Sequence, residues 1–343
     1  PDMKLGIIGL PRAGKSTVFD ALTQNITGPE HKGRDRIATV RVPDDRVDAL
    51  SRMVNPQKTI YAQVEYFLPG LMKDSAADPS LWTAVRDCDA LLHVIRNHAT
   101  YGFETPSPAR DFSKLDQELV LADLVVAEKR LERIALDHKR GKKRDSEEYD
   151  LLMACRDCLE NEIPLRNRSD LASAHRLRGF AFLSAKPVLI LFNNEDDDDH
   201  LPNIERFAAT EEGLVIRAKL EQELAQMAPD EAAEFLAEFN IPASAMDRVI
   251  RQSYALLDLI SFFTIISDEV RAWTIKKGTP ALEAAGHIHS DMQKGFIRAE
   301  VISFQNLIEA GSYSQAKKQG TVRLEGKTYE VQDGDVVQFR FNV

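Results

Sequence analysis

Short apolar runs alternate with helix-like segments along the first part of the chain. Residues 4–8, 90–95 and 187–192 are almost wholly apolar and of strand length, which is typical of parallel strands that are buried on both faces. Residues 16–24 and 81–88 carry apolar side chains at helical spacing. This alternation predicts an α/β domain, with helices on both faces of a mostly parallel sheet.

The pattern changes after residue 112. Apolar residues recur at helical spacing among charges as far as residue 162, and a glycine with basic neighbours at 141–145 interrupts the run. Two long antiparallel helices are therefore predicted, largely exposed to solvent. Further elements are expected as strands at 37–42, 60–68 and 213–217 and as helices at 220–227, 230–239 and 245–257.

The C-terminal part of the chain combines strand candidates with turn residues between them. The candidates are residues 270–275, 295–304, 321–324, 329–331 and 336–341. A compact α+β module is therefore expected at this end of the chain.

Composition narrows the class of protein. The chain has 343 residues, 43% of them hydrophobic, and a net charge of −10, which is typical of a globular protein with two or three domains. This acidity argues against nucleic-acid binding over the whole surface and leaves a local basic face open. The cysteines at 88, 155 and 158 form no disulfide framework, no apolar run reaches membrane-spanning length, and the start shows no signal region. We therefore expect a cytoplasmic protein with no membrane partner, acting as a monomer.

One motif lies between the first predicted strand and the first predicted helix. Residues 9–17 read G-L-P-R-A-G-K-S-T and fit the phosphate-binding loop G-x-x-x-x-G-K-[ST]. Backbone N–H groups and the helix N-terminus would surround the phosphates, Lys15 would reach the β- and γ-phosphates, and the hydroxyl of Ser16 would bind Mg²⁺. The predicted phosphate-binding residues are Gly9, Arg12, Ala13, Gly14, Lys15, Ser16 and Thr17.

Several stretches resemble one family of P-loop proteins. Besides the loop, residues 42–46 (VPDDR), 294–302 (KGFIRAEVI) and 331–336 (VQDGDV) are similar to the YchF-type proteins of the Obg-related family, also called Obg-like ATPases. The resemblance extends over nearly the whole chain. It implies a P-loop G domain at 1–110 and 180–258, a helical coiled-coil insertion at 111–179 and a ubiquitin-like α+β TGS domain at 259–343.

The resemblance also implies a function. Proteins of this family bind and hydrolyse ATP or GTP with Mg²⁺, and they associate with ribosomes. ATP or GTP, Mg²⁺, and the ribosome or RNA are therefore the expected ligand, cofactor and partner.

A second motif concerns the base. Residues 193–196 read N-N-E-D, where GTPases have Asn-Lys-x-Asp and YchF-type proteins have Asn-x-x-Glu. Asn193 and Asp196 are therefore the expected base-binding residues, together with Ala218, which matches the middle of the family's Ser-Ala-Lys. Arg217 departs from that motif. The family favours ATP, whereas Asp196 suits guanine, so both nucleotides stay open.

Two departures from the family affect the metal and the hydrolysis. The family has Asp-x-x-Gly after its third strand, and its Asp organises the Mg²⁺ shell; here Phe67 replaces that Asp, while Gly70 is kept and offers an N–H to a γ-phosphate. Glu65 is either a substitute ligand or an ordinary surface carboxylate, and the switch threonine has no clear counterpart, since Thr39 falls in the next predicted strand. Hydrolysis is therefore predicted to be weak or lost. The alternative is a non-hydrolysing adaptor that binds RNA or the ribosome through the hairpin and the TGS domain.

Further departures lie in the loop and the switches. Arg12 stands where the family usually has Asn, and its guanidinium either stabilises phosphate charge in cis or points to solvent. The first switch, between residues 24 and 36, is shortened. Leu71 fits the hydrophobic residue that replaces the water-orienting Gln in this family, and residues 72–79 replace its glycine-rich second switch.

Other clusters give weaker signals. Cys155 and Cys158 lie on one helix face without a second pair, which favours packing over a redox or metal site. The acidic run 196–199 with His200, and the pair His287 and His289, lack the further ligands of a metal site.

Two basic clusters are candidates for contact with RNA. The tip of the predicted hairpin, residues 139–144, is the densest basic cluster and is either an RNA contact or a solvated turn. Lys294, Phe296 and Arg298 alternate as in an RNA-binding strand and also as in any half-buried strand.

Overall fold

The computed structural model describes residues 3–24, 33–70, 79–203, 212–239, 241 and 243–342. By its contacts the chain divides into two compact units. We call Pro1–Thr39 with Glu65–Val249 the N-terminal unit, and Val40–Val64 with Ile250–Val343 the C-terminal unit. The sequence analysis assigned residues 40–64 to the predicted G domain and did not foresee their packing with the C-terminal part; the three predicted domains stay a prediction.

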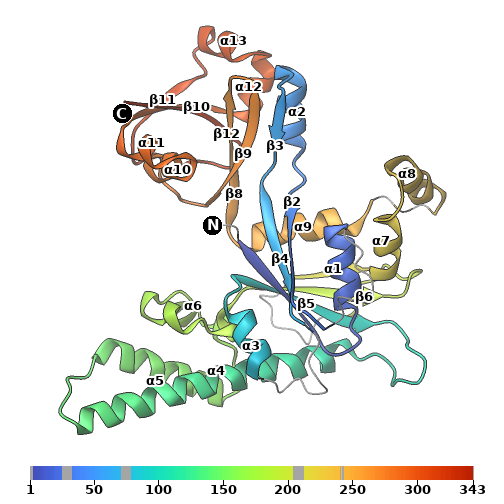
Figure 1. Ribbon diagram of the computed structural model, residues 1–343, viewed down its shortest axis with the longest axis vertical. Coiled ribbons are helices and arrows are strands. Elements are labelled where there is room, and N and C mark those ends of the chain that lie inside the picture. The colour runs from blue at the N-terminus through green and yellow to red at the C-terminus, as the bar shows by residue number, and fades with distance from the viewer. Residues whose placement is uncertain are drawn as a thin grey trace. The chain divides into compact units, whose positions relative to one another are not determined.

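A six-stranded sheet in the order β2-β4-β1-β5-β6-β7 carries the phosphate-loop motif (Figure 1). The pairs β4–β1, β1–β5, β5–β6 and β6–β7 are parallel, so the strands end at a common edge. The predicted α/β class is confirmed. The strands are β1 (Lys4–Ile8), β2 (Arg36–Arg41), β4 (Gln63–Leu68), β5 (Ala90–Asn97), β6 (Val188–Asn194) and β7 (Glu212–Ile216).

Helices cover both faces of this sheet, as predicted. Helices α1 (Lys15–Thr23) and α7 (Ala218–Leu224) pack together on one face, and α3 (Pro79–Arg86) and α4 (Pro108–Lys139) lie on the other (Figure 1). Two more helices follow α7 along the chain, α8 (Pro229–Glu238) and α9 (Ala245–Leu256). The core beneath α3 and α4 includes Ile8, Phe67, Trp82, Val85, Leu91, Ile95, Phe112, Leu115 and Phe192.

The predicted helical hairpin is present. Helix α4 runs beside α5 (Ser146–Glu160), which the carboxylate of Asp145 caps by accepting the N–H of Glu148 (Figure 1). The hairpin also has an apolar core of its own, to which the short elements after α5 contribute. These elements are η2 (Leu165–Asn167), α6 (Ser169–Ala172), η3 (His175–Phe180) and η4 (Leu183–Ala185). Within the described residues no helix, α4 included, combines the length and apolar character needed to cross a membrane.

A second six-stranded sheet, in the order β11-β10-β12-β8-β9-β3, forms the C-terminal unit. The buried alanines of helix α10 (Ala281–Ile288) pack against Phe262, Val301 and Phe339 of this sheet. The strands are β3 (Lys58–Ile60), β8 (Leu259–Ile266), β9 (Glu269–Lys276), β10 (Phe296–Ser303), β11 (Arg323–Glu325) and β12 (Asp335–Phe341). The helices are α2 (Asp45–Val54), α10 (Ala281–Ile288), α11 (Ser290–Lys294), α12 (Phe304–Ala310) and α13 (Tyr313–Lys318).

Several elements differ from the predicted ones. Strand β8 and helix α2 were not predicted, and the single strand expected at 60–68 is two strands, β3 and β4. The break falls where the Tyr61 hydroxyl donates to Asp48 of α2 and Arg41 stacks on the ring. The strand predicted at 329–331 is wrong, because the structure contains only an isolated bridge from Glu330 to Pro280.

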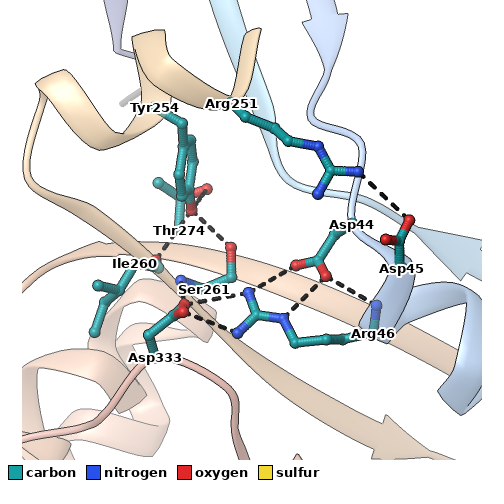
Figure 2. Close-up of polar contacts among 9 residues, drawn as sticks. All are labelled: Asp44, Asp45, Arg46, Arg251, Tyr254, Ile260, Ser261, Thr274 and Asp333. Atoms are coloured by element: carbon teal, nitrogen blue, oxygen red, sulfur yellow. Dashed lines mark hydrogen bonds and ion pairs between the residues drawn. The ribbon is translucent and has the colours of Figure 1, made fainter. Parts of the chain in front are cut away.

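An ion-pair network fastens the start of α2 within the C-terminal unit (Figure 2). Asp44 caps α2 and accepts from the guanidinium of Arg46, which also donates to Asp333 over 2.8 and 3.2 Å. The same Asp333 accepts the backbone N–H of Ser261, in β8, over 3.0 Å. Two of the stretches that resemble the family, 42–46 and 331–336, are therefore joined through Arg46 and Asp333, and Asp333 also binds β8.

We expect Asp333→Ala to loosen this part of the C-terminal unit. The substitution removes the acceptor of the Ser261 N–H and one of the two carboxylates that bind Arg46, which keeps Asp44. A hydrogen bond to a charged group contributes about 1.5–3 kcal/mol, and the Arg46 pair contributes less because the Asp333 side chain is 51% exposed. Amide hydrogen exchange should become faster in α2 and β8. Asp45→Ala is the matched control, because Asp45 is 90% exposed and pairs with Arg251 at 3.4 Å, a surface contact worth about 0–1 kcal/mol. Equal exchange in both variants would contradict the role given to Asp333.

Candidate nucleotide site

The phosphate-loop motif forms the turn from β1 to α1. Strand β1 ends at Ile8 and α1 begins at Lys15. The Lys15 ammonium folds back over the loop and donates to the carbonyl oxygens of Gly9 and Leu10, over 2.8 and 3.0 Å. Burial lowers the pKa of Lys15 to about 8. The hydrogen-bond acceptors of this ammonium are thus neutral carbonyl groups. An anionic phosphate would accept a stronger, charge-assisted hydrogen bond from it.

Two glycines are required by the space around the loop. Gly14 has φ 100°, in the left-handed region, and a Cβ there would lie 2.4 Å from Nδ2 of Asn193. A Cβ on Gly9 would lie 2.4 Å from the carbonyl oxygen of Val94, in β5. The motif glycines therefore allow the loop to lie directly against its neighbours.

The start of α1 supplies hydrogen-bond donors. The N–H groups of Lys15, Ser16 and Thr17 lie in the first helical turn, where helix geometry gives them no acceptor within the helix. Gly14, the N-cap, has no side chain to cap them. The N–H of Ala13 donates within the loop, to Leu10, over 3.2 Å. The predicted anion site therefore rests on the helix start, where the helix dipole adds to it.

One side chain joins the loop to the predicted base segment. Nδ2 of Asn193, in β6, donates to the Ala13 carbonyl over 3.0 Å, and its Oδ1 accepts the N–H of Ala218 over 3.0 Å. Both ends of the amide are thus in use, and Ala218 is buried. The arrangement gives Asn193 a positioning role between residues that are 180 and 25 positions away in the sequence.

The rest of the N-N-E-D segment is held from the loop that follows β5. Oδ1 of Asn194 accepts from Asn97 over 2.8 Å, and Oε1 of Glu195 accepts the N–H of Ala99 over 2.6 Å. Asp196 is exposed beyond them, and its carbonyl accepts from Arg217 over 3.3 Å. The exposed carboxylate of Asp196 therefore lies next to an ordered segment.

Phe67 belongs to the core and not to the loop. Its side chain is 5% exposed and packs with the apolar cluster beneath α3 and α4. Glu65 pairs with Lys4 at 3.6 Å, and the register of β4 on β1 places it beside the start of β1, opposite the loop end. The surface interpretation of Glu65 thus fits better than that of a substitute ligand. Thr39 lies in β2, as expected.

The N–H of Gly70 is hydrogen-bonded to a carboxylate of the same chain. Its N–H, which was expected to face a γ-phosphate, donates to Oδ1 of Asp35 over 2.7 Å. A phosphate at this N–H would have to displace the Asp35 carboxylate. The first-switch residues 25–32, Leu71 and residues 72–78 of the second switch lie outside the described residues.

Arg12 stacks on an aromatic ring. It has φ 65°, in the left-handed region, is exposed, and holds its guanidinium 4.0 Å from the ring centre of Phe103, in the segment after β5. The guanidinium is therefore exposed to solvent, which is one of the two alternatives given above, and it also has an aromatic partner beside the loop.

Among the described residues, the oxygen donors near the loop fit a resident Mg²⁺ poorly. The hydroxyl-bearing Ser16 is exposed at the start of α1, but nearby carboxylates have other partners. Asp20, one turn later, pairs with Arg36 at 2.5 Å and accepts from Gln222 over 3.0 Å. Asp35 binds the Gly70 N–H. Mg²⁺ prefers an octahedral set of oxygen atoms, and the place of the family's carboxylate is taken by a buried ring.

The weaker metal and thiol candidates do not form sites in the described part of the chain. Residues 3–24, 33–70, 79–203, 212–239, 241 and 243–342 contain no group of three His, Cys, Asp or Glu side chains placed to hold a metal. Cys155 and Cys158 are free and packed in the hairpin core, and burial raises the pKa of Cys155 to about 12. His289 caps α11 by accepting the Asp291 N–H.

The two candidate RNA surfaces differ. Phe296 is 6% exposed and packs in the C-terminal core, so it offers no ring for stacking. Of the three candidate residues, only Lys294, at the end of α11, and Arg298, in β10, are exposed. The hairpin tip at 139–144 is exposed throughout, although Lys142 pairs with Asp137 at 3.0 Å.

Three residues that shape this site, Asp35, Glu195 and Phe103, were not predicted from the sequence. Each acts on a residue far away in the sequence, and only the sheet order brings the pairs together. The one available signal was position, because Phe103 and Glu195 follow buried parallel strands, whose carboxyl ends commonly form binding sites.

Comparisons with known proteins agree with this fold. A family model named YchF-GTPase_C and described as a protein of unknown function (DUF933) matches residues 259–342. The "Ribosome-binding ATPase YchF" of Bacillus subtilis is 37% identical over 98% of this chain and 99% of its own length. The protein of that name from Escherichia coli O157:H7 is 37% identical over 99% of each chain.

A solved structure, that of the Schizosaccharomyces pombe YchF GTPase, superimposes with a TM-score of 0.87 at 27% identity, covering 99% of this chain and 98% of that one. Identity and coverage of this extent, together with the loop and the sheet that carries it, show that the chain belongs to the YchF family.

Proposed function

We propose that the chain binds a nucleoside triphosphate at the loop between β1 and α1. The observation that carries this proposal is the arrangement of Lys15 over a loop that opens onto the start of α1, clamped by Asn193 to the base segment. The names of the relatives support it, since those of B. subtilis and E. coli are called ATPases and that of S. pombe a GTPase.

ATP is the nucleotide that we propose, with GTP as the second candidate. The curated relatives are named for ATP, whereas the carboxylate of Asp196 suits the two donors of guanine. Because both ends of the Asn193 amide are in use, we assign direct base contact to Asp196 and a positioning role to Asn193 and Ala218.

The proposed partner is the ribosome. The relatives from B. subtilis and E. coli are named ribosome-binding, and the exposed basic tip at 139–144 is a suitable contact for an RNA backbone. A ribosome partner would place the protein in the cytoplasm.

Hydrolysis is proposed to be slow or lost. Phosphoryl transfer depends on metal-assisted charge neutralisation and on positioning, and the buried Phe67 cannot supply the family's metal-organising carboxylate. The same observation favours a second candidate function, that of a nucleotide-binding adaptor without turnover.

We expect Lys15→Ala to weaken ATP binding about 100-fold, because charged hydrogen bonds to phosphate are lost. Calorimetric titration measures the change, and Lys129→Ala, at an exposed position of α4, is the matched control. A similar affinity in Lys15→Ala and the wild type would show that the loop is not the phosphate site.

The affinity for ATP should also depend on pH. Bound phosphate favours the ammonium form of Lys15, so binding raises its pKa above the value of about 8 that burial gives it. The affinity for ATP is then full below the pKa of about 8 that Lys15 has without nucleotide, and it falls up to about tenfold per pH unit above that value. Lys15→Arg, whose guanidinium stays protonated, should give a flat profile between pH 6.5 and 9.5. A flat wild-type profile would contradict a role for the ammonium.

Turnover should be at least about 100-fold slower than that of the B. subtilis relative in the same assay, with and without ribosomes. Co-sedimentation with ribosomes in the same samples separates binding from hydrolysis. Comparable rates for the two proteins would refute the loss of activity, and failure to co-sediment would refute the ribosome as partner.

A further inference from the structure

Among the described residues, the charge of Arg12 has no carboxylate partner. Its side chain is exposed, and the structure places its guanidinium 4.0 Å from the ring centre of Phe103, which is itself 48% exposed. A cation–π contact between exposed groups is weak compared with a charge-assisted bidentate hydrogen bond from arginine to phosphate. The contact can therefore hold the guanidinium beside the loop without preventing its transfer to a phosphate.

Phe103 holds this charge at the edge of the sheet where phosphates would bind. Its segment follows β5, which lies between β1 and β6 in the sheet. The beginning of the segment is fixed to the base motif by the contacts of Asn97 with Asn194 and of Ala99 with Glu195. Arg12 thus rests on a segment that is tied to the nucleotide site and not on a remote surface.

The site needs a second positive charge. A bound triphosphate carries several negative charges, and in P-loop proteins a lysine and Mg²⁺ neutralise them. Here Lys15 is present, but Phe67 is buried where the family has its carboxylate, and Asp20 is already paired with Arg36. The donors of the described residues therefore disfavour the metal, and Arg12 is the second cation of the loop sequence 9–17.

We propose that Arg12 is a phosphate-binding residue that leaves Phe103 when a triphosphate binds and supplies in cis the positive charge that Mg²⁺ supplies in a P-loop site with its carboxylate. Nucleotide binding by this chain is then largely independent of metal. The inference rests on the proposed nucleotide site and adds the ligand's terminal phosphate as the target of Arg12.

Titration with fluorescent ATP and ADP analogues, each in EDTA and in excess Mg²⁺, tests the proposal. The wild type should bind the ATP analogue with an affinity that Mg²⁺ changes less than about threefold. Arg12→Ala in EDTA should lose about 30-fold in affinity for the ATP analogue and less than about threefold for the ADP analogue. Added Mg²⁺ should recover part of the loss, and Arg12→Lys should keep an intermediate affinity.

Two further variants separate phosphate binding from a merely structural contact. Phe103→Ala frees the guanidinium, so its ATP affinity should equal that of the wild type or exceed it by about twofold. Arg110→Ala removes the same charge from a surface pair with Glu104, at 3.0 Å, and should change nothing. Phe103→Trp adds a direct readout, because its fluorescence should change on ATP binding as the cation leaves the ring.

Each alternative result counts against the proposal in a different way. Equal affinity of Arg12→Ala and the wild type in EDTA, or a wild type that needs Mg²⁺, overturns the role of Arg12 while leaving the nucleotide site intact. Equal weakening by Arg12→Ala and Phe103→Ala would mean that the pair only holds the loop in shape. A wild type that binds neither analogue overturns the proposed function, and the inference with it.

Discussion

The amide of Asn193 is the interaction on which the site depends. It uses both of its ends, one on the loop carbonyl of Ala13 and one on the N–H of Ala218, and it leaves no room for a Cβ at Gly14. Because β1, β5 and β6 are parallel neighbours, their carboxyl ends bring these distant residues together. The shape of the loop and the position of the base segment are thus set by one side chain at the end of a buried strand, so a change there disturbs both at once.

The sequence was sufficient for several regular local patterns, although not for β8, α2 or residues 329–331. The buried strands, the helical hairpin and the strand–loop–helix of the phosphate motif all follow from periodicity and glycine spacing, and they are confirmed. It was not sufficient where the partners lie far apart. The bond from Gly70 to Asp35, the stacking of Arg12 on Phe103 and the packing of residues 40–64 with the C-terminal unit leave no periodic trace, because they depend on sheet order and register.

Two of the stretches that carry the family resemblance, 42–46 and 331–336, have a structural role. Asp44, Arg46 and Asp333 belong to two such stretches, and together they hold the start of α2 against β8 (Figure 2). The departures, by contrast, bear on the nucleotide site, since Arg12 lies in the phosphate loop and Phe67 is a core residue where the family has its carboxylate. Similarity to the family therefore shows the fold of this chain, whereas its chemistry depends on the individual residues of the site. This is expected because one fold can carry sites of different function.

The charges around the loop give the physical basis for the proposal that this chain binds a triphosphate and cleaves it slowly. Positive groups remain available on the loop side, in Lys15 and Arg12, and the start of α1 adds its dipole. The carboxylates of Asp20 and Glu65 are matched to Arg36 and Lys4. Lys15, Arg12 and the start of α1 would attract a triphosphate. A bound Mg²⁺ would need free carboxylates, and those of Asp20 and Glu65 are already paired with Arg36 and Lys4. Attraction for a triphosphate can therefore outlast the ability to cleave it, since binding requires only charge and donors, and cleavage requires in addition a fixed geometry around the transferring group.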